Sequence, residues 1–290
     1  MIDVGLMIEG QDGVSWGRWQ ALARAAEGAG YAGLYRSDHF TNPDGPHLDA
    51  LELWTSFTWL ATQTERLVFG PVVAPVSFRD PIMAAWSAAS INTLAPGRMR
   101  LGLGAGWQER EHREFGYDLL DLDGRFRRFT EALEVVSLLL RTEGPVSFAG
   151  EFYTLDGGEF MPNPISIGRV PIVIGGNGAR RTLPLAARYA DEWNGVYLSR
   201  ENFKERNALL DDLARAEKRD PEDIRRTVMT RVIFGRDEEQ LASRLEEQDP
   251  DELRANGLVV GLASDIPDQL RAWEEAGADG IMLQWVDDLD

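Results

Sequence analysis

Short apolar segments alternate with longer segments of helical period along most of this 290-residue chain, and this alternation restricts the folds open to it. Runs rich in valine, isoleucine and leucine predict strands at 2–8, 31–37, 66–73, 98–105, 171–176, 192–196, 227–235 and 279–285. Helices are predicted at 16–29, 49–63, 81–94, 125–141, 178–190, 201–217, 237–247 and 265–276. A helix between successive strands is the crossover that parallel strands require.

This order of elements predicts the α/β class and, within it, the (β/α)8 TIM barrel. A doubly wound open sheet of eight strands is the structural alternative. The surplus residues form two insertions, one at 143–170 after the fourth strand and helix, and one at 248–264 before the last helix, where 250–254 has helical character. Because no Pro/Gly/Ser-rich linker or internal repeat divides the chain, we expect a single domain over residues 1–290.

The charge balance limits the partners. The chain has 48 acidic and 30 basic residues, a formal net charge of -18, which repels nucleic acid phosphates and anionic membrane surfaces. It has no cysteine, which excludes thiolate catalysis and fits a reducing compartment. With no signal peptide pattern and no long apolar run, we expect a cytoplasmic protein that binds neither nucleic acid nor membrane.

Active sites of (β/α)8 barrels lie at the carboxyl ends of the strands, so the residues there are the first candidates. The fourth strand ends in LGLGAGW, where Gly102, Gly104 and Gly106 leave one side open to a flat ligand ring or to another backbone. Glycines that only allow the core to pack are the alternative reading. Trp107, which follows, would line the rim of a pocket or pack against it.

The fifth predicted strand leads into GGNGARRT at 175–182 and then into a helix. A glycine-rich turn at a helix N-terminus presents backbone N–H groups, and Arg180 and Arg181 add positive charge, so a phosphate is the expected ligand. An ordinary strand-to-helix turn with surface arginines is the alternative.

His39, at the end of the second predicted strand, is the candidate acid or base, because histidine exchanges protons near neutral pH. Asp38 beside it would orient the ring or cap the following loop. A structural role for His39 is the alternative. His47 and His112 are expected to be solvated. The three histidines lack metal-ligand spacing, so no metal site is expected, and no GxSxG nucleophile motif is present.

At this point the sequence resembles the luciferase-like superfamily, and within it the deazaflavin (F420)-dependent oxidoreductase branch. The resemblance rests on GRMRLGLGAGWQEREHREFGYDL at 97–119, YAGLYRSDHF at 31–40, GPVVAPVSFRDP at 70–81, VSFAGEFY at 146–153 and PIVIGGNGARRTLPLAARYADEWN at 171–194. These segments occur in the order expected of the family.

The resemblance implies a barrel that binds coenzyme F420, or alternatively FMN, beside a bulge in the third strand. That bulge, which in similar proteins often contains a non-proline cis peptide, would fall here at Pro71-Val72, and the sequence leaves open whether this bond is cis. The implied cofactor contacts are Pro71, Val72, Ala74, Gly104, Ala105, Gly106 and Trp107, with the phosphate at Gly175, Gly176, Asn177, Gly178, Arg180 and Arg181. His39 matches a histidine that acts on substrate in similar dehydrogenases. Trp107 stands where some sugar-phosphate dehydrogenases have a glutamate, which argues against that substrate class.

Three functions follow as hypotheses. The first is hydride transfer between F420 and an organic small-molecule substrate, with His39 and Asp38 as catalytic residues. The second is an FMN-dependent monooxygenase of the same fold, and the third is a noncatalytic protein that binds deazaflavin or flavin. The substrate and the oligomeric state stay open, although similar proteins are often homodimers.

Overall fold

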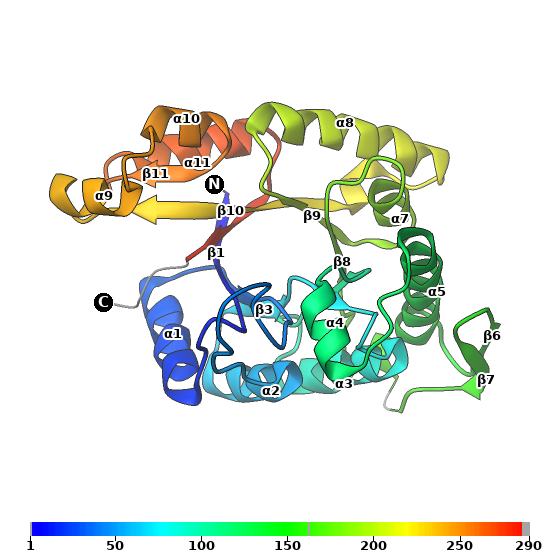
Figure 1. The fold of residues 1–290 in the computed structure, drawn as a ribbon. Coiled ribbons are helices and arrows are strands. Elements are labelled where there is room, and N and C mark those ends of the chain that lie inside the picture. Colours follow the sequence, from blue (N-terminus) through cyan, green and yellow to red (C-terminus); the bar gives the residue numbers. More distant parts are fainter. Residues whose placement is uncertain (1, 162, 286–290) are drawn as a thin grey trace. The chain divides into compact units, whose positions relative to one another are not determined.

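The computed structural model describes residues 2–161 and 163–285. Contacts between residues divide the chain into two compact units. The N-terminal unit comprises Glu9–Ile174, and the C-terminal unit comprises Met1–Ile8 together with Gly175–Asp290. Each contains parallel strands and helices of its own (Figure 1). The single domain over 1–290 stays a prediction.

The N-terminal unit is built on short parallel strands. They are β2 (Gly33–Arg36), β3 (Val68–Pro71), β4 (Ala74–Pro75), β5 (Leu101–Gly104) and β8 (Ile172–Gly175). β2 pairs with β3, and β5 lies between β4 and β8. Phe69 exchanges backbone hydrogen bonds with Arg98 and Arg100, which holds β3 beside the segment that leads into β5.

Six helices are described in this unit, and their ends follow capping chemistry. They are α1 (Trp16–Ala29), α2 (Leu53–Gln63), α3 (Pro81–Leu94), α4 (Glu109–Phe115), α5 (Leu122–Arg141) and α6 (Pro164–Ile167). Asp80 accepts hydrogen bonds from the backbone of Ile82 and Met83, and Pro81 occupies the first position of α3, where no intrahelical N–H bond is lost. On α5 the apolar residues Phe129, Leu133, Val136 and Leu140 recur at helical spacing and are buried.

The insertion at 143–170 contains an antiparallel hairpin that the sequence did not predict. Its strands are β6 (Val146–Ala149) and β7 (Thr154–Gly158), and it lies beside α5 (Figure 1). The Glu131 carboxylate of α5 accepts backbone N–H bonds from Glu151 and Phe152 at the turn. The hairpin is therefore attached to α5 through the backbone of its turn.

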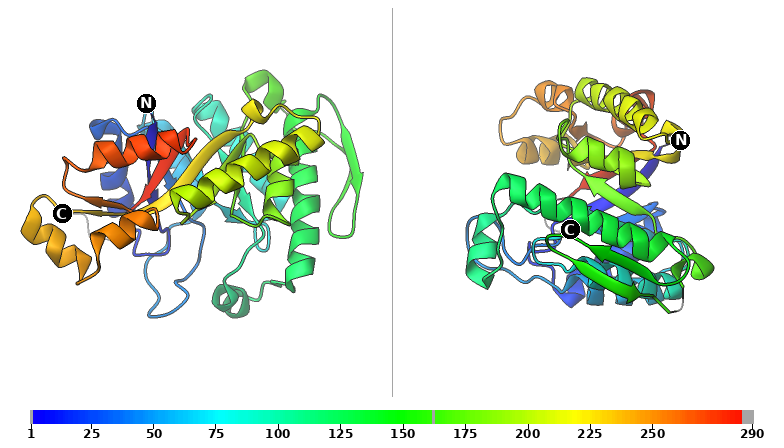
Figure 2. Two further views of the ribbon diagram at one scale, coloured as in Figure 1. Left: turned by 90° about the horizontal axis from the view of Figure 1, so that it is seen from above. Right: turned by 90° about the vertical axis from the view of Figure 1, so that its right-hand side faces the viewer.

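The C-terminal unit has one parallel sheet in the order β1 (Asp3–Ile8), β12 (Gly280–Gln284), β10 (Arg225–Phe234), β9 (Glu192–Val196). The last residues of β10 also pair with β11 (Val259–Gly261). The helical elements are α7 (Thr182–Tyr189), α8 (Arg200–Ala216), η1 (Pro221–Asp223), α9 (Glu238–Leu245), α10 (Pro250–Ala255) and α11 (Ile266–Glu275). Figure 2 shows α9 and α10 at the far end of the long strand β10.

The predicted strands and helices all have counterparts within the described residues. The elements that were not predicted individually are β4, β6, β7, β11, α4, α6 and η1. The predicted helical character at 250–254 corresponds to α10. β11 has only three residues, too few for a recognisable alternation, and α4 arises in a run of charges without apolar periodicity. Across the described residues, no helix has the length and apolarity needed to cross a bilayer.

Candidate functional site

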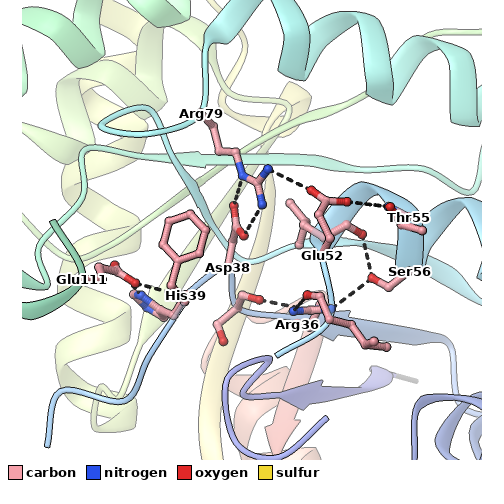
Figure 3. Close-up of polar contacts among 12 residues, drawn as sticks. Arg36, Asp38, His39, Glu52, Thr55, Ser56, Arg79 and Glu111 are labelled. Atoms are coloured by element: carbon pink, nitrogen blue, oxygen red, sulfur yellow. Dashed lines mark hydrogen bonds and ion pairs between the residues drawn. The ribbon is translucent and has the colours of Figure 1, made fainter. Parts of the chain in front are cut away.

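The central pair of the candidate site is His39 and Glu111, both in the N-terminal unit. His39 follows the end of β2, and Glu111 lies on α4 (Figure 3). The Nδ1 atom of His39 is 2.8 Å from Oε1 of Glu111, and the other carboxylate oxygen accepts the backbone N–H of Phe40 at 2.9 Å. The exposed fraction of the side chain is 13% for His39 and 1% for Glu111. The carboxylate is therefore enclosed, whereas part of the imidazole reaches the surface of the unit.

The environment of His39 favours its cationic form. Burial acts to lower the pKa of His39, but the hydrogen bond and charge of Glu111, with smaller contributions from Glu9 and Asp38, raise it above its ordinary value. A carboxylate at Nδ1 also fixes the tautomer, because it accepts a proton from that nitrogen. Nε2 is then the nitrogen at which His39 gains or loses a proton.

Glu111 was not singled out from the sequence, because the charged run around it does not show which side of the helix is buried. Gln108, Glu111 and His112 are buried on one side of α4 and its cap, while Glu109 is exposed. The Gln108 side chain exchanges two hydrogen bonds with Thr41, through Nε2 to the Thr41 carbonyl at 2.8 Å and from the Thr41 hydroxyl at 3.0 Å. This link fixes α4 against the segment that follows His39.

The predictions for the other two histidines have different outcomes. His112 is not solvated as expected, because its exposed fraction is 2% and its Nδ1 lies 2.6 Å from the carbonyl oxygen of Gln108. His47 is exposed, with Glu114 3.5 Å away. The reason for the error at His112 is that the charged run forms a helix with one buried side.

Asp38 does not orient His39. Its two carboxylate oxygens each accept a hydrogen bond of 2.8 Å from Arg79, at Nε and Nη2, and Arg79 also donates to Glu52 at 2.9 Å (Figure 3). Burial disfavours the charge on Arg79, but Asp38 and Glu52 outweigh it and raise the pKa of Arg79. Asp38 thus belongs to an ion-pair network, and Glu111 takes the orienting role predicted for it.

Arg36, the last residue of β2, stabilises the segment that carries Asp38 and His39. Its guanidinium is buried and donates to the carbonyls of Ser37 and Leu51 and to the hydroxyl of Ser56. Burial lowers the pKa of Arg36 to about 10. Gly10 packs against it so closely that a β-carbon there would lie 2.3 Å from Nη2 of Arg36. These contacts fix the chain that carries Asp38 and His39.

Trp107 contacts the His39 imidazole, and Phe40, the next residue along the chain, belongs to a cluster of aromatic rings. Trp107 has an exposed fraction of 59% and meets the imidazole edge-on, with 5.6 Å between ring centroids. Phe40 packs against Phe78, Phe115 and Tyr117 at centroid distances of 4.7 to 5.9 Å. Trp107 thus contacts the imidazole from an exposed position, and its place at a pocket rim stays a prediction.

The glycines of β5 face a neighbouring segment of the same chain, at Pro71 and Val73. A β-carbon at Gly102 would lie 2.0 Å from the Pro71 carbonyl, and one at Gly104 would lie 2.4 Å from Cγ2 of Val73. Close approach of another chain segment, one of the readings left open by the sequence, therefore explains glycine at both positions. Ala105 follows β5 and is partly buried.

The cis peptide bond is Val72-Val73 and not Pro71-Val72. The shift by one residue has a local reason. Pro71 still pairs with Arg36 in β3, and the N–H of Val72 donates to the Arg36 carbonyl at 2.9 Å, so regular pairing ends only after Val72. Ala74 is fully buried in β4 beside this bond.

The glycine-rich turn predicted to bind phosphate belongs to the C-terminal unit. Asn177 donates from Nδ2 to the Val196 carbonyl at 2.7 Å and accepts the Val196 N–H at 2.9 Å. Gly176 has φ of 119°, a value that favours glycine, and its N–H donates to the Asn194 carbonyl. Asn177 therefore fastens the turn to the end of β9, while Gly175 continues β8 into it.

The N–H groups at the start of α7 are not open, contrary to expectation. Those of Arg181, Thr182 and Leu183 all point to the carbonyl oxygen of Gly178, at 2.9 to 3.3 Å. The side chains of Arg180 and Arg181 are exposed. Any phosphate here would therefore be held mainly by guanidinium groups, and this role stays a prediction.

The sequence and the fold of this chain match those of known proteins. A model of the luciferase-like monooxygenase family matches residues 4–248. The chain belongs to this family. No group of three or more histidine, aspartate and glutamate side chains suited to a metal ion occurs in the part of this luciferase-like protein that the structure describes.

Two curated relatives illustrate the range of the family. Pyrimidine monooxygenase RutA of Allorhizobium ampelinum is 30% identical over 154 residues, which cover 52% of this chain and 41% of the relative. An F420-dependent glucose-6-phosphate dehydrogenase of Amycolatopsis mediterranei is 25% identical over 271 residues, which cover 90% of this chain and 78% of the relative. Against RutA the chain thus spans less than half of the relative's length.

The solved structure of an F420-dependent secondary alcohol dehydrogenase in complex with an F420-acetone adduct superimposes with a TM-score of 0.83. The match has 19% sequence identity and covers 98% of this chain and 93% of the other. The fold class predicted from the sequence, a (β/α)8 barrel of the α/β class, is confirmed. The resemblance to the luciferase-like superfamily is also confirmed, and the relatives support its F420-dependent branch.

Proposed function

We propose that this chain is an oxidoreductase that transfers a hydride between coenzyme F420 and an organic small molecule, with His39 as the proton donor or acceptor. The single observation that carries the proposal is the His39–Glu111 pair, a partly exposed imidazole whose Nδ1 is held by an enclosed carboxylate. F420-dependent dehydrogenases among the relatives support the choice of cofactor.

Two features of the described residues fit this cofactor. Trp107 offers an exposed aromatic surface next to His39, as a flat ring requires. Arg180 and Arg181 offer exposed guanidinium groups suited to a phosphate, on a turn that Asn177 holds in place. When bound, F420 would supply the hydride acceptor or donor.

The residues of this chain would manage the proton. Oxidation of an alcohol releases a hydride from carbon and a proton from the hydroxyl, and neutral His39 would accept that proton at Nε2. In the reverse direction cationic His39 would return it to the carbonyl oxygen. Glu111 would keep Nδ1 protonated throughout, so that only Nε2 exchanges protons with substrate. The aromatic rings near His39 would limit the access of water.

An FMN-dependent monooxygenase is the second candidate, and the 30% identity to a pyrimidine monooxygenase favours it. The cofactor separates the two, because reduced flavin reacts readily with oxygen whereas deazaflavin essentially does not. A noncatalytic protein that binds either cofactor remains the third hypothesis.

A fluorescence titration of the purified protein with F420 and, separately, with FMN tests the proposal. We expect saturable binding of F420 that is weakened at least tenfold, about 1.4 kcal/mol, when Arg180 and Arg181 are both changed to alanine. The matched control changes Arg24 and Arg271, which are exposed on α1 and α11, and should leave affinity unchanged.

Each other outcome has a definite reading. Binding of FMN without F420 would replace the proposal with the monooxygenase. Tight binding of F420 without reduction of the cofactor by any of a panel of alcohols would favour the noncatalytic protein. Binding of neither cofactor would refute the assignment to F420.

A further inference from the structure

A second candidate site lies wholly within the C-terminal unit, apart from the residues considered above. It is a cavity of about 870 Å³, within the range of small-molecule sites. The residues that line it are Tyr197, Ser199, Asn202, Arg231, Ala255, Asn256, Leu258 and Gln284. Most of them carry side chains that form hydrogen bonds.

The cavity lies at the carboxyl ends of β9 and β12 and beside the longer strand β10. β9 ends at Val196, directly before Tyr197, and the Tyr197 N–H still donates to the Met229 carbonyl of β10. Arg231 of β10 pairs in register with Gln284, the last residue of β12. The carboxyl ends of parallel strands are where α/β proteins bind their ligands, so the position favours a binding site.

Arg231 is the only charged side chain among the described residues that line the cavity. It is exposed, although Thr230 and Val232 on either side of it are buried in the strand. Among the described residues that line the cavity, none has a carboxylate side chain. Arg231 therefore gives the described lining of the cavity a positive charge in a chain whose formal net charge is -18.

The remaining polar groups add hydrogen-bond capacity. Ser199 is the N-cap of the 17-residue helix α8, so the positive end of the helix dipole lies at the cavity. Asn202 in the first turn of α8 and Asn256 at the end of α10 supply amide groups. The Tyr197 hydroxyl donates to Oε1 of Gln284, which orients that amide.

We propose that this cavity binds the anionic group of a small molecule, a carboxylate or a phosphate ester, with Arg231 as its counter-charge. The guanidinium fork matches either group through two parallel hydrogen bonds. The inference goes beyond the proposed function and does not depend on F420 or on His39.

Isothermal titration with inorganic phosphate and, separately, with succinate tests the site at constant ionic strength. We expect saturable binding of at least one anion, weakened about tenfold or more in Arg231→Gln. Arg231→Lys keeps the charge but loses the fork, and should weaken binding less. Arg271→Gln, which removes one exposed charge from α11, is the matched control and should bind as the unaltered protein does.

Repeating the titration on protein saturated with F420 distinguishes the sources of the anion. Anion binding that persists assigns the cavity to a substrate or effector, whereas loss of binding assigns it to the cofactor's own phosphate. If Arg231→Gln does not fold, as judged by circular dichroism, the affinity of Arg231→Lys is compared with that of the unaltered protein instead. No saturable binding in the millimolar range, or equal weakening in Arg271→Gln, would overturn the proposal, whether or not F420 binds.

Discussion

Replacing Glu111 by glutamine removes a charge from the buried side of α4 with almost no change of shape. Glu111 accepts two hydrogen bonds, from Nδ1 of His39 and from the backbone of Phe40. Glutamine has one carbonyl oxygen to offer, so one of these donors loses its acceptor. The pKa of His39 should fall, because the hydrogen bond and charge that raise it are removed while the burial that lowers it remains.

The loss of stability should depend on pH. A hydrogen bond to a charged group contributes about 1.5–3 kcal/mol and a neutral one about 0.5–1.5 kcal/mol, so we expect a loss of about 2–3 kcal/mol while His39 is cationic. Because the folded pKa of His39 is raised, this stabilisation is fully present below its unfolded value of 6.5. It is lost as the pH rises through the folded pKa.

Urea unfolding of Glu111→Gln and of the unaltered protein, at pH values on both sides of this range, measures the effect. NMR titration of the His39 ring measures its pKa directly. Glu114→Gln, an exposed change on the same helix, is the control and should have little effect at any pH. A loss of stability that does not vary with pH, together with an unmoved His39 titration, would refute the coupling. In an active preparation, the pH profile of turnover should shift toward lower pH with the histidine.

Two further substitutions probe the frame around this pair. Asp38→Asn removes the charge and one of the two oxygens that accept hydrogen bonds from Arg79, and should cost about 3 kcal/mol in urea unfolding. It should shift the His39 pKa less than Glu111→Gln does, and an equal shift would contradict the separate roles. Gly104→Ala places a β-carbon against Val73 and should lower stability by about 1–3 kcal/mol. Its control, Gly28→Ala in α1, has open space at that position and should not destabilise.

Most elements of the fold could be predicted because their signals lie within their own residues. The bounds of α3 agree with the prediction since Asp80 and Pro81 mark its start within the sequence itself. The β6–β7 hairpin and β11 could not be predicted in this way. The hairpin is fixed by the carboxylate of Glu131 on a different element, and β11 exists through its pairing with β10.

The candidate site shows the same division between local and distant information. His39 was predicted from its place at the end of a strand, which is a local property. Its partner Glu111 lies 72 residues further along the chain. The choice of that partner depends on which side of α4 is buried, and charged residues alone do not reveal it. The N–H groups before α7 failed as a prediction because the carbonyl of Gly178 already occupies them.

Asp38 was the nearest acid in sequence, and that nearness is the physical reason it does not serve His39. Consecutive side chains of an extended segment point to opposite sides of the chain. Asp38 and His39 accordingly reach different partners, Arg79 on one side and Glu111 on the other (Figure 3). Asp38, paired with Arg79, fixes the segment and raises the pKa of His39 only a little, whereas Glu111 contacts the imidazole directly and raises that pKa most. A histidine at the end of a strand should therefore be matched with acids on a neighbouring helix before the acid adjacent to it in sequence.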